Sequence, residues 1–425
     1  MAHPLLAQSA SSAPSGRRNF LIRVLAGGSA AALRSAGIAG IAGSAACGVY
    51  PAEDGAAYEP WHYPPREPLE PVELNAVAAA ILAASPHNTQ PWLFEVRPGR
   101  VDLFADTERS LGAMDPFHRE MTMGLGCAIE NLVTGATQFG LRADVVLLPV
   151  PEEPNHVARI TLTPDSTVVE DPLAKAIPNR HTHRGAYMEN PMPAAFEAAF
   201  RGEVANALTR AVPAPQVTVG SPPVSLYLIQ SVEDKARFRQ ATIDATRAIN
   251  ADADMSHDGH AWYRHSAKDI DTHRDGVTID ATGNGATLRT FGKALPAPSA
   301  SSAGNYWLDA TKGAQTTAGA FGILATPDRY SRIEQLICGR VFQRLHLWAT
   351  SEGLAIQPLN QLPERQDREK QLSQPEQSAA LLASFMESRT DVGAQFLFRI
   401  GYAWDPVISS PRRPVAWVVR AEDRP

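Results

Sequence analysis

The chain has 425 residues, of which 44% are hydrophobic and 20% are charged, with 30 glycines and 34 prolines. This ordinary globular composition excludes a disordered, collagen-like or coiled-coil protein, and the length suits two or three domains. The formal net charge is −6, and the first 46 residues contain four arginines and no acid, so the remainder carries about −10. We therefore expect no nucleic-acid partner, because an acidic protein repels phosphate backbones.

Residues 1–46 are predicted to be a twin-arginine export signal. Arg17 and Arg18 precede a weakly apolar stretch rich in Ala and Gly. A membrane anchor is the alternative, but this stretch is weakly apolar and is interrupted by Arg34. We expect export by the twin-arginine machinery, to the periplasm or to the outer face of the cytoplasmic membrane. Small residues before Cys47 are compatible with simple cleavage or with a lipid anchor at that cysteine.

Residues 47–70 are rich in proline and are predicted to be a linker. Beyond them, the apolar periodicity predicts helices over 71–84, 118–139 and 329–352, and strands over 92–97, 100–105, 143–149, 156–163, 224–230, 319–326 and 395–401. Residues 251–318 are rich in Asp, His, Gly, Ser and Thr, and the apolar periodicity fades there. We expect this segment to be an insertion or lid.

An internal repeat relates two of the predicted helices. Aligning residues 126–141 with residues 339–354 gives six identities in sixteen positions. Both copies end in Gly-Leu, and Gly140 and Gly353 are placed where a left-handed helix cap is expected. Chance similarity between two Ala-rich helices is the alternative, and we prefer a duplicated half-domain.

The loop Ser85–Trp92 carries several polar side chains between a predicted helix and a predicted strand. Its two prolines stiffen the backbone, and loops of this kind present groups to ligands. The carboxamides of Asn88 and Gln90 each offer a donor and an acceptor, which suits a flat heterocycle such as the isoalloxazine ring. A purely structural loop, capped by Ser85 and Asn88, is the alternative.

A basic cluster lies at residues 180–184, where Arg180 and Arg184 stand on either side of Thr182. In an extended segment these alternate side chains share one face, with His181 and His183 on the other. Two guanidinium groups and a hydroxyl fit a phosphate group, and a solvated loop with salt bridges is the alternative.

Near the C-terminus, Arg412 and Arg413 add two cations that are candidates for the same anion, unless they form a simple basic tail.

Other motifs are weak. The three cysteines are too few for a disulfide scaffold and lack the paired spacing of a zinc site. No dinucleotide-binding glycine motif, phosphate-binding P-loop or nucleophile elbow is found in the region after the leader. Four histidines in residues 251–318 match no metal-site spacing, so we favour a polar lid and expect no metal there: His257, His260, His265 and His273.

With these residues in hand, the chain resembles the nitroreductase-like flavoproteins, specifically the two-lobed FMN-binding Acg family, over roughly residues 70–420. The loop Ser85–Trp92 resembles the family's ring-binding S-x-x-N-x-Q-P-W loop, and Arg180–Arg184 resembles its phosphate-binding R-x-S/T-x-R segment. Gly339–Leu354 resembles a helix whose end approaches the flavin, and Ser410–Val415 resembles the family's terminal segment. The four motifs occur in the family's order.

The resemblance implies an α+β, nitroreductase-like fold duplicated in one chain. The lobes would be residues 71–170 and 171–425, the second containing the lid-like insertion 251–318, in a monomeric pseudo-dimer. One FMN would bind between the lobes. The opposite site is expected to be empty, because Ser221-Pro222-Pro223 is at best a degraded ring loop.

The resemblance also implies the cofactor contacts and the activity. Its assignments are Arg180, Thr182 and Arg184 to the phosphate, supported by Arg412 and Arg413; Asn88 and Gln90 to the ring's polar edge; and Ser85, His87 and the Gly353 backbone to the rest of the cradle. No side chain is assigned as a catalytic acid or base. The implied activity is two-electron transfer through flavin N5, from a small-molecule donor to a nitroaromatic, quinone or similar acceptor.

Two alternatives to this activity stay open. One is a non-enzymatic protein that stores or sequesters FMN under the lid. The other is a lipid-anchored binding module for another heterocycle.

Overall fold

A computed structural model describes residues 53–212, 223–284, 289, 292–293 and 295–420. The predicted leader, Cys47, Ser221 and Pro222 lie outside the described residues. By the density of its contacts the chain divides into residues 1–49 and residues 50–425, and all described residues belong to the second unit.

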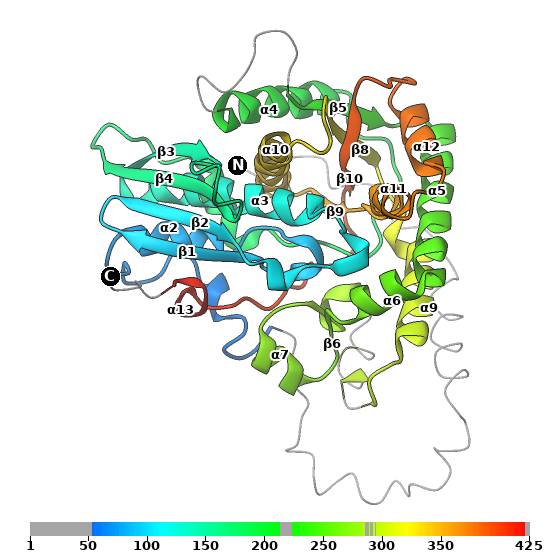
Figure 1. The fold of residues 1–425 in the computed structure, drawn as a ribbon, viewed down its shortest axis with the longest axis horizontal. Coiled ribbons are helices and arrows are strands. Elements are labelled where there is room, and N and C mark those ends of the chain that lie inside the picture. Colours follow the sequence, from blue (N-terminus) through cyan, green and yellow to red (C-terminus); the bar gives the residue numbers. More distant parts are fainter. Residues whose placement is uncertain (1–52, 213–222, 285–288, 290–291, 294, 421–425) are drawn as a thin grey trace, which may run out of the picture. The chain divides into compact units, whose positions relative to one another are not determined.

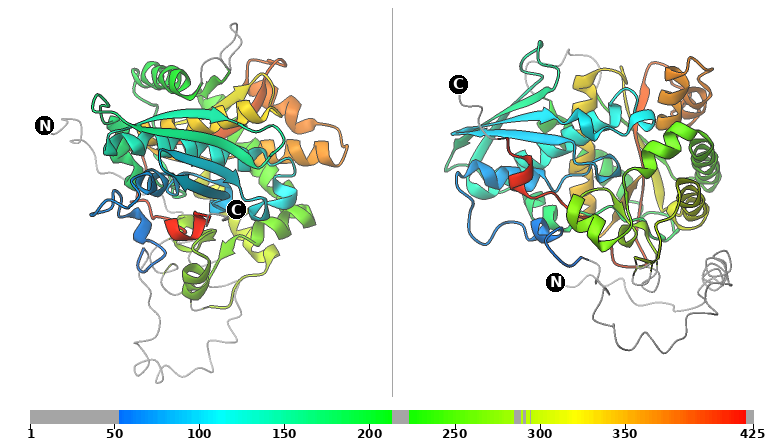
Figure 2. Two further views of the ribbon diagram at one scale, coloured as in Figure 1. Left: turned by 60° about the vertical axis from the view of Figure 1, so that its left-hand side comes forward. Right: turned by 60° about the horizontal axis from the view of Figure 1, so that its bottom comes forward.

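The described part of the chain combines helices with antiparallel sheets (Figures 1 and 2). The helices are α2 (Glu73–Ala80), α3 (Arg119–Ala136), α4 (Phe196–Ala211), α5 (Val232–Ala251), α6 (Ala253–His260), α7 (Ala267–His273), α9 (Ala300–Ala310), α10 (Arg332–Ser351), α11 (Gln361–Gln371), α12 (Gln377–Phe385) and α13 (Val415–Val418). The strands are β1 (Trp92–Arg97), β2 (Arg100–Ala105), β3 (Leu141–Leu147), β4 (His156–Pro164), β5 (Ser225–Ile229), β6 (Tyr263–Arg264), β7 (Val277–Thr278), β8 (Ala320–Thr326), β9 (Ala355–Pro358) and β10 (Gly393–Gly401).

Two four-stranded antiparallel sheets have the same topology. Their strand orders are β1-β2-β4-β3 and β5-β8-β10-β9, so in each sheet the strands run first, second, fourth, third in chain order. In each, the long helix lies between the second and third strands of the sequence, as α3 and α10 respectively. The two halves of the chain therefore repeat one order of core elements. A further two-stranded parallel sheet, β6-β7, lies inside the insertion.

The helices α3 and α10 pack against each other between the two sheets (Figure 1). A Cβ atom on Gly126 would overlap the carbonyl oxygen of Leu336, and one on Gly339 would overlap the carbonyl oxygen of Met123. In the repeat alignment Gly126 corresponds to Gly339, and the same offset, extended by three residues, pairs Met123 with Leu336. The two close approaches are therefore equivalent, as in an interface between identical subunits related by a twofold axis.

Several predicted elements are confirmed closely. The hairpin strands 92–97 and 100–105 occur at the predicted residues, and Gly99 has a φ of 72° in the turn. Gly140 and Gly353 have φ of 65° and 71° after the helices that they follow, as predicted for left-handed caps. The first helix, predicted over residues 71–84, is shorter in the structure. Its regular α-helical part ends at Ala80, before the loop that carries Ser85.

The described part of the predicted linker is packed into the fold. Ala57, Tyr58 and Tyr63 are buried. The Ala57 carbonyl accepts a hydrogen bond of 2.7 Å from the backbone N–H of Arg412. Treating residues 47–70 as a simple linker was therefore wrong for residues 53–70. The apolar residues there were too few to show a period.

The insertion is more regular than its sequence suggested. It contains α6, α7 and α9, which begin at polar caps rather than at apolar repeats. Asp252, Ser266 and Ser299 each accept a hydrogen bond from a backbone N–H of the first turn, which supplies the helix start.

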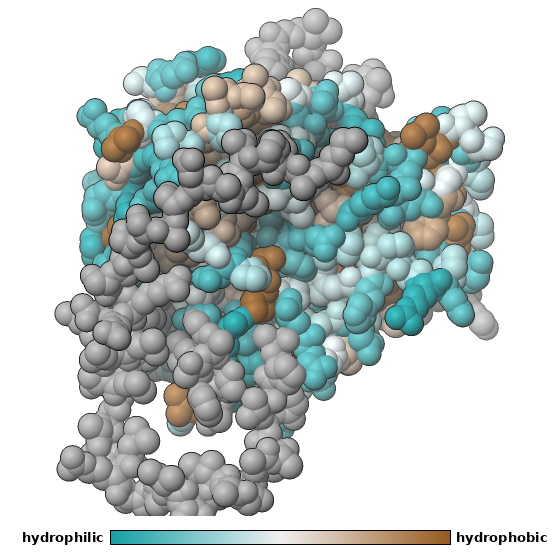
Figure 3. Space-filling view, turned by 180° about the vertical axis from the view of Figure 1, so that it is seen from behind, coloured by the Kyte–Doolittle hydropathy of each residue, from teal (hydrophilic) through white to brown (hydrophobic). Residues whose placement is uncertain are grey.

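Figure 3 shows one face of the molecule, where hydrophilic residues predominate and apolar residues form small separate spots. None of the described helices is both long enough and apolar enough to cross a membrane.

Candidate functional site

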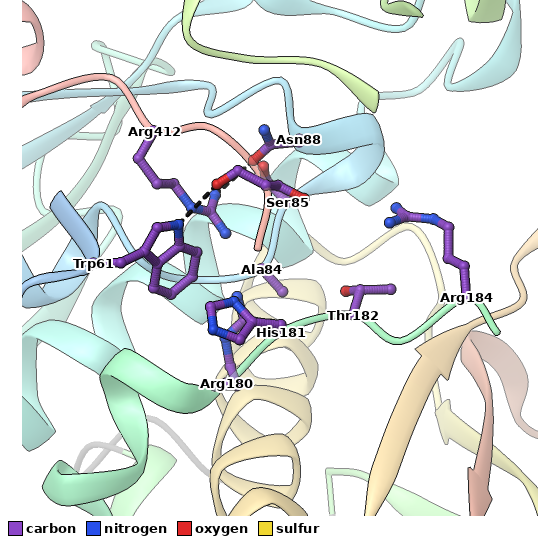
Figure 4. A pocket seen from close by; sticks show the side chains of 10 residues that line it. Trp61, Ala84, Ser85, Asn88, Arg180, His181, Thr182, Arg184 and Arg412 are labelled. Atoms are coloured by element: carbon purple, nitrogen blue, oxygen red, sulfur yellow. Dashed lines mark hydrogen bonds between the residues drawn. The ribbon is translucent and has the colours of Figure 1, made fainter. Parts of the chain in front are cut away.

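One pocket gathers residues from four distant parts of the chain (Figure 4). It is lined by Trp61, Ala84, Ser85, Asn88, Arg180, His181, Thr182, Arg184, Ser410 and Arg412. The loop between α2 and β1, the segment after Asn179 and the C-terminal segment thus meet around one cavity. The sequence motifs that we singled out in these three segments are therefore close in space.

Three guanidinium groups line this pocket without a carboxylate partner among the described residues: Arg180, Arg184 and Arg412. Other buried arginines are paired, for example Arg119 with Asp367 at 2.6 Å and Arg340 with Glu130 at 3.0 Å. A buried cation without a counter-ion is costly, so the pocket is suited to an anion.

Arg399 is also buried without a carboxylate partner in the described part of the chain, but it has a different environment. Its three terminal nitrogens donate to neutral oxygens of five residues, which satisfies the guanidinium within the protein. It does not line the pocket. Missing countercharge is common to both cases, and the unpartnered Nε atoms of Arg180 and Arg412 distinguish these two arginines from Arg399.

Arg180 is held by two neutral acceptors. Its Nη2 donates to the Leu82 carbonyl at 3.0 Å, and its Nη1 lies 3.2 Å from Nδ1 of His346. Its Nε is buried and has no hydrogen-bond partner among the described residues. Burial lowers the pKa of Arg180 to about 10, because no nearby carboxylate stabilises the charge.

Arg412 reaches the same end of the pocket from the C-terminal segment. Its Nη1 donates to Oδ1 of Asn88 at 2.6 Å, and its guanidinium lies 4.8 Å from the centre of the Trp61 ring. Its Nε is likewise buried without a partner in the described structure. Burial and the charge of Arg180 together lower the pKa of Arg412 well below its ordinary value.

Arg184 lies apart from these two cations. Figure 4 shows Arg180 and Arg412 beside Trp61, with Arg184 at the opposite side of the pocket. Its Nη1 donates to the Ala281 carbonyl at 3.2 Å. Arg184 and Arg180 nevertheless line the same pocket, so their shared assignment to one phosphate stays a prediction.

The alternation predicted for residues 180–184 fails at His181. This side chain lines the pocket together with Thr182, and its ring meets the Trp61 ring edge to face at 4.2 Å. His183 turns away and lies 2.6 Å from the Asp405 carbonyl through its Nε2. Burial, followed by the charges of Arg180 and Arg412, lowers the pKa of His181 to about 3.

The two predicted ring-binding carboxamides are engaged within the protein. Asn88 lines the pocket, but its Nδ2 donates to the carbonyls of Gly276 and Pro411. Gln90 is fully buried outside the lining, where its Nε2 donates to the Arg274 carbonyl at 2.8 Å and its Oε1 accepts from the Arg413 backbone.

Three further predicted residues are not part of this lining. Arg413 donates to the carbonyls of Gln90 and Trp417. Gly353 is exposed at the end of α10. His87 lies near Arg184, and burial followed by that charge lowers its pKa to about 4.

Sequence reasoning missed Trp61, which lies in the segment predicted to be a linker. Its Nε1 donates to the Ser410 carbonyl at 2.8 Å, which ties the N-terminal segment to the C-terminal one. The only signal in the sequence was a tryptophan among prolines. Such a residue in a linker would expose a large apolar surface, so its presence favours packing.

The insertion is fastened to the predicted ring loop. Gly276 donates its backbone N–H to the Asn88 carbonyl at 3.1 Å. Asp275, which is 3% exposed, pairs with Arg264 at 2.8 Å and with Arg109, whose Nε donates to the Thr89 carbonyl. The insertion therefore contacts one wall of the pocket, as expected for a lid.

The residues present fit the phosphate of FMN. A phosphate monoester offers several charged acceptor oxygens, and the buried Nε atoms of Arg180 and Arg412 are donors without partners among the described residues. No group of three or more His, Cys, Asp or Glu in the described part of the chain is arranged to hold a metal ion.

Parts of the chain are similar to known proteins. No protein-family model matches the chain. Over 135 residues it is 36% identical to a Mycobacterium tuberculosis protein whose name assigns it to the NAD(P)H nitroreductases, covering 31% of this chain and 38% of that protein. It is 35% identical over 119 residues to the M. tuberculosis NAD(P)H nitroreductase named acg, covering 28% and 36% respectively. The chain thus spans less than two fifths of the length of these relatives.

Among solved structures, the chain is similar to the FMN-dependent nitroreductase NfnB from Mycobacterium smegmatis, which was solved with NADPH. That match has a TM-score of 0.35 at 14% identity, and it covers 58% of this chain and 96% of that one.

Proposed function

We propose that this protein is an FMN-binding oxidoreductase of the nitroreductase type, which takes electrons from a small-molecule donor such as NAD(P)H and passes them to a small acceptor. One observation carries the proposal: three guanidinium groups without carboxylate partners in the described structure line the same pocket, and two of them, Arg180 and Arg412, are buried. The similarity to proteins named as NAD(P)H nitroreductases supports it.

The residues of the pocket would bind FMN from its phosphate end. Arg180 and Arg412 would donate to the phosphate oxygens, and their two neutral acceptors, His346 and Asn88, fix the direction of each guanidinium. The Thr182 hydroxyl is a further donor in the lining. When bound, FMN supplies two-electron transfer chemistry, so the protein needs no catalytic acid or base for that step.

Arg184 would act at the other end of the pocket. Its charge is held by the Ala281 carbonyl of the insertion, away from Arg180 and Arg412. There it would offer the bound cofactor a further positive charge. A cation in that position favours negative charge on a bound group.

The test is an absorption spectrum of the purified protein near 450 nm, followed by anaerobic titration with NADH or NADPH and then with a nitroaromatic or quinone. The proposal requires yellow protein, bleaching by the donor and recovery of the colour with the acceptor. Colourless protein that does not take up added FMN would refute it, and would favour a binding module for another heterocycle.

Storage of FMN is the second candidate function, and one observation favours it. The side-chain amides of Gln90 and Asn88 donate hydrogen bonds to the backbone carbonyls of Arg274 and Gly276 in the insertion. The insertion therefore lies against the predicted ring loop. A lid in this position would limit access to the ring. Storage requires that bound FMN resist reduction by NAD(P)H or fail to reduce the acceptor.

We also infer a duplicated, pseudo-dimeric fold of the nitroreductase type. The shared strand order and the equivalent contacts of Gly126 and Gly339 support it. Because the three pocket arginines belong to one site, the inferred stoichiometry is one FMN per chain, in a monomer.

Export by the twin-arginine route completes the proposal. It rests on the Arg17-Arg18 pair and on the weakly apolar stretch that follows. Replacing both arginines by lysine should abolish export. The mass of the mature protein would distinguish simple cleavage from a lipid at Cys47.

A further inference from the structure

His346 contacts the anion site without lining it. It lies on α10 and is fully buried, with its Nδ1 3.2 Å from Nη1 of Arg180. Its Nε2 lies 3.2 Å from the carbonyl oxygen of His181. The ring thus bridges Arg180 and the backbone of the next residue, and both belong to the pocket lining.

These two contacts fix the protonation of the imidazole. A guanidinium only donates hydrogen bonds and a carbonyl oxygen only accepts them. Nε2 must therefore carry the proton that is donated to His181, and Nδ1 must present its lone pair to Arg180. Burial, and then the charge of Arg180, lower the pKa of His346 well below its ordinary value, which keeps the ring neutral.

The neutral acceptor that α10 offers to Arg180 contrasts with the partners of the arginines on α10 itself. Arg340 pairs with Glu130 at 3.0 Å, and Arg344 pairs with Asp171 at 2.8 Å. Each carboxylate orients its guanidinium but also neutralises it. An imidazole lone pair orients the guanidinium and leaves its full positive charge for another anion.

We propose that His346 is a positioning residue of the anion site, which directs Arg180 toward the ligand phosphate without cancelling its charge. This inference rests on the proposed function, because it needs an anion bound at Arg180. His346 itself makes no contact with the ligand. Its effect is confined to ligands that carry a phosphate.

Three substitutions of His346 in the full chain test the inference, with FMN, inorganic phosphate and riboflavin as probes. His346→Gln keeps one donor and one acceptor, and should bind FMN within about threefold of wild type. His346→Leu removes the acceptor and should weaken FMN about 10- to 100-fold. His346→Glu supplies a carboxylate that neutralises Arg180, and should weaken FMN and phosphate about 100-fold or more.

Riboflavin separates positioning from general damage, because it lacks the phosphate. Its affinity should be the same in all folded variants, whereas a merely structural role would weaken all three probes together. FMN affinity that is unchanged in His346→Leu and His346→Glu would overturn the inference. Failure of His346→Gln to rescue FMN binding would do the same.

Two further outcomes are informative. If wild-type protein binds neither FMN nor phosphate, the proposed function fails and His346 loses its role with it. If the leucine variant does not fold, the ¹⁵N chemical shifts of His346 in wild-type protein decide instead. A protonated Nδ1 would contradict the inference, and an unprotonated Nδ1 beside a protonated Nε2 would support it.

Discussion

At the scale of single residues, the site is distinguished by arginines that have no carboxylate partner among the described residues. Arg180 and Arg412 are buried as deeply as Arg119, but only Arg119 has a carboxylate partner among the described residues. The uncompensated charge is a cost to the fold unless an anion binds. This is why we assign the pocket to the phosphate of the cofactor.

Neighbouring arginines provide the sharpest residue-level comparison. Arg412→Ala should weaken FMN binding at least about 10-fold, because it removes a charged hydrogen bond to the phosphate. Arg413→Ala should weaken it less, because Arg413 bonds to the carbonyls of Gln90 and Trp417 outside the lining. Isothermal titration calorimetry with FMN measures the affinity of each apoprotein variant. Equal losses of FMN affinity in the two variants would place Arg413 in the site.

His87 predicts a dependence of stability on pH. Its pKa is lowered to about 4 by burial and by Arg184, so the folded protein resists protonation there. Between the ordinary histidine pKa of about 6.5 and about pH 4, only the unfolded chain gains this proton, so the free energy of unfolding falls as the pH falls. In the His87→Asn variant, the free energy of unfolding should fall by about 2 kcal/mol less than in wild type over this pH window. Urea titrations at several pH values measure the difference. Parallel curves for variant and wild type would refute the assignment.

The sequence identified most of the pocket lining but missed Trp61, which belongs to it, and His346, which lies behind it. The predicted residues that line the pocket all lie in recognisable motifs: Ser85, Asn88, Arg180, Thr182, Arg184 and Arg412. Trp61 and His346 could not be found, because their roles depend on packing between segments far apart in the chain. The sequence indicated the insertion at residues 251–318, but not that its Arg274 carbonyl would accept a hydrogen bond from the Gln90 carboxamide.

At the scale of elements, α3 and α10 approach each other closely at two glycines. Gly126→Ala and Gly339→Ala should each lower the free energy of unfolding by about 2 kcal/mol or more, because the added methyl meets a carbonyl oxygen of the facing helix. Gly202→Ala in α4 is the control. Nothing lies within 4 Å of its added methyl, so stability should stay the same or rise by up to about 1 kcal/mol.

Similar losses at the two crossing positions would support their equivalence in the repeat. Denaturant unfolding followed by circular dichroism measures all three variants. A loss at Gly126 without one at Gly339 would contradict the reciprocal contact.

The attachment of the insertion makes a second prediction at this scale. Asp275→Asn removes the charge that holds Arg109 and Arg264, so the insertion should open more often. FMN should then dissociate about tenfold faster or more in stopped-flow fluorescence. Asp271→Asn is the control, because that exposed carboxylate makes only a long contact of 3.9 Å with Arg274. An unchanged dissociation rate in Asp275→Asn would show that the insertion does not limit release.

Elements were predictable where the hydrophobic pattern was strong. The strands 92–97 and 100–105 alternate cleanly around a Pro-Gly turn, and they occur where predicted. The helices α6, α7 and α9 were missed, because they bury few residues and so carry little apolar periodicity. Their caps were present in the sequence, and the Ser266-Asp269 capping box is one that could have been noticed.

At the scale of the whole molecule, two similar halves enclose a site that is not symmetric. Both sheets share one strand order, and the long helices cross at equivalent glycines. The pocket arginines occur once, in the segment between the halves and in the C-terminal segment. The described pocket therefore does not follow the repeated order of the core elements.

The most direct test of this account is a titration of the apoprotein with FMN and with riboflavin. If Arg180 and Arg412 bind the phosphate, one FMN should bind per chain, and riboflavin should bind at least about 100-fold more weakly. Equal affinity for the two flavins would contradict the account, because the buried guanidinium groups would then have no part in binding.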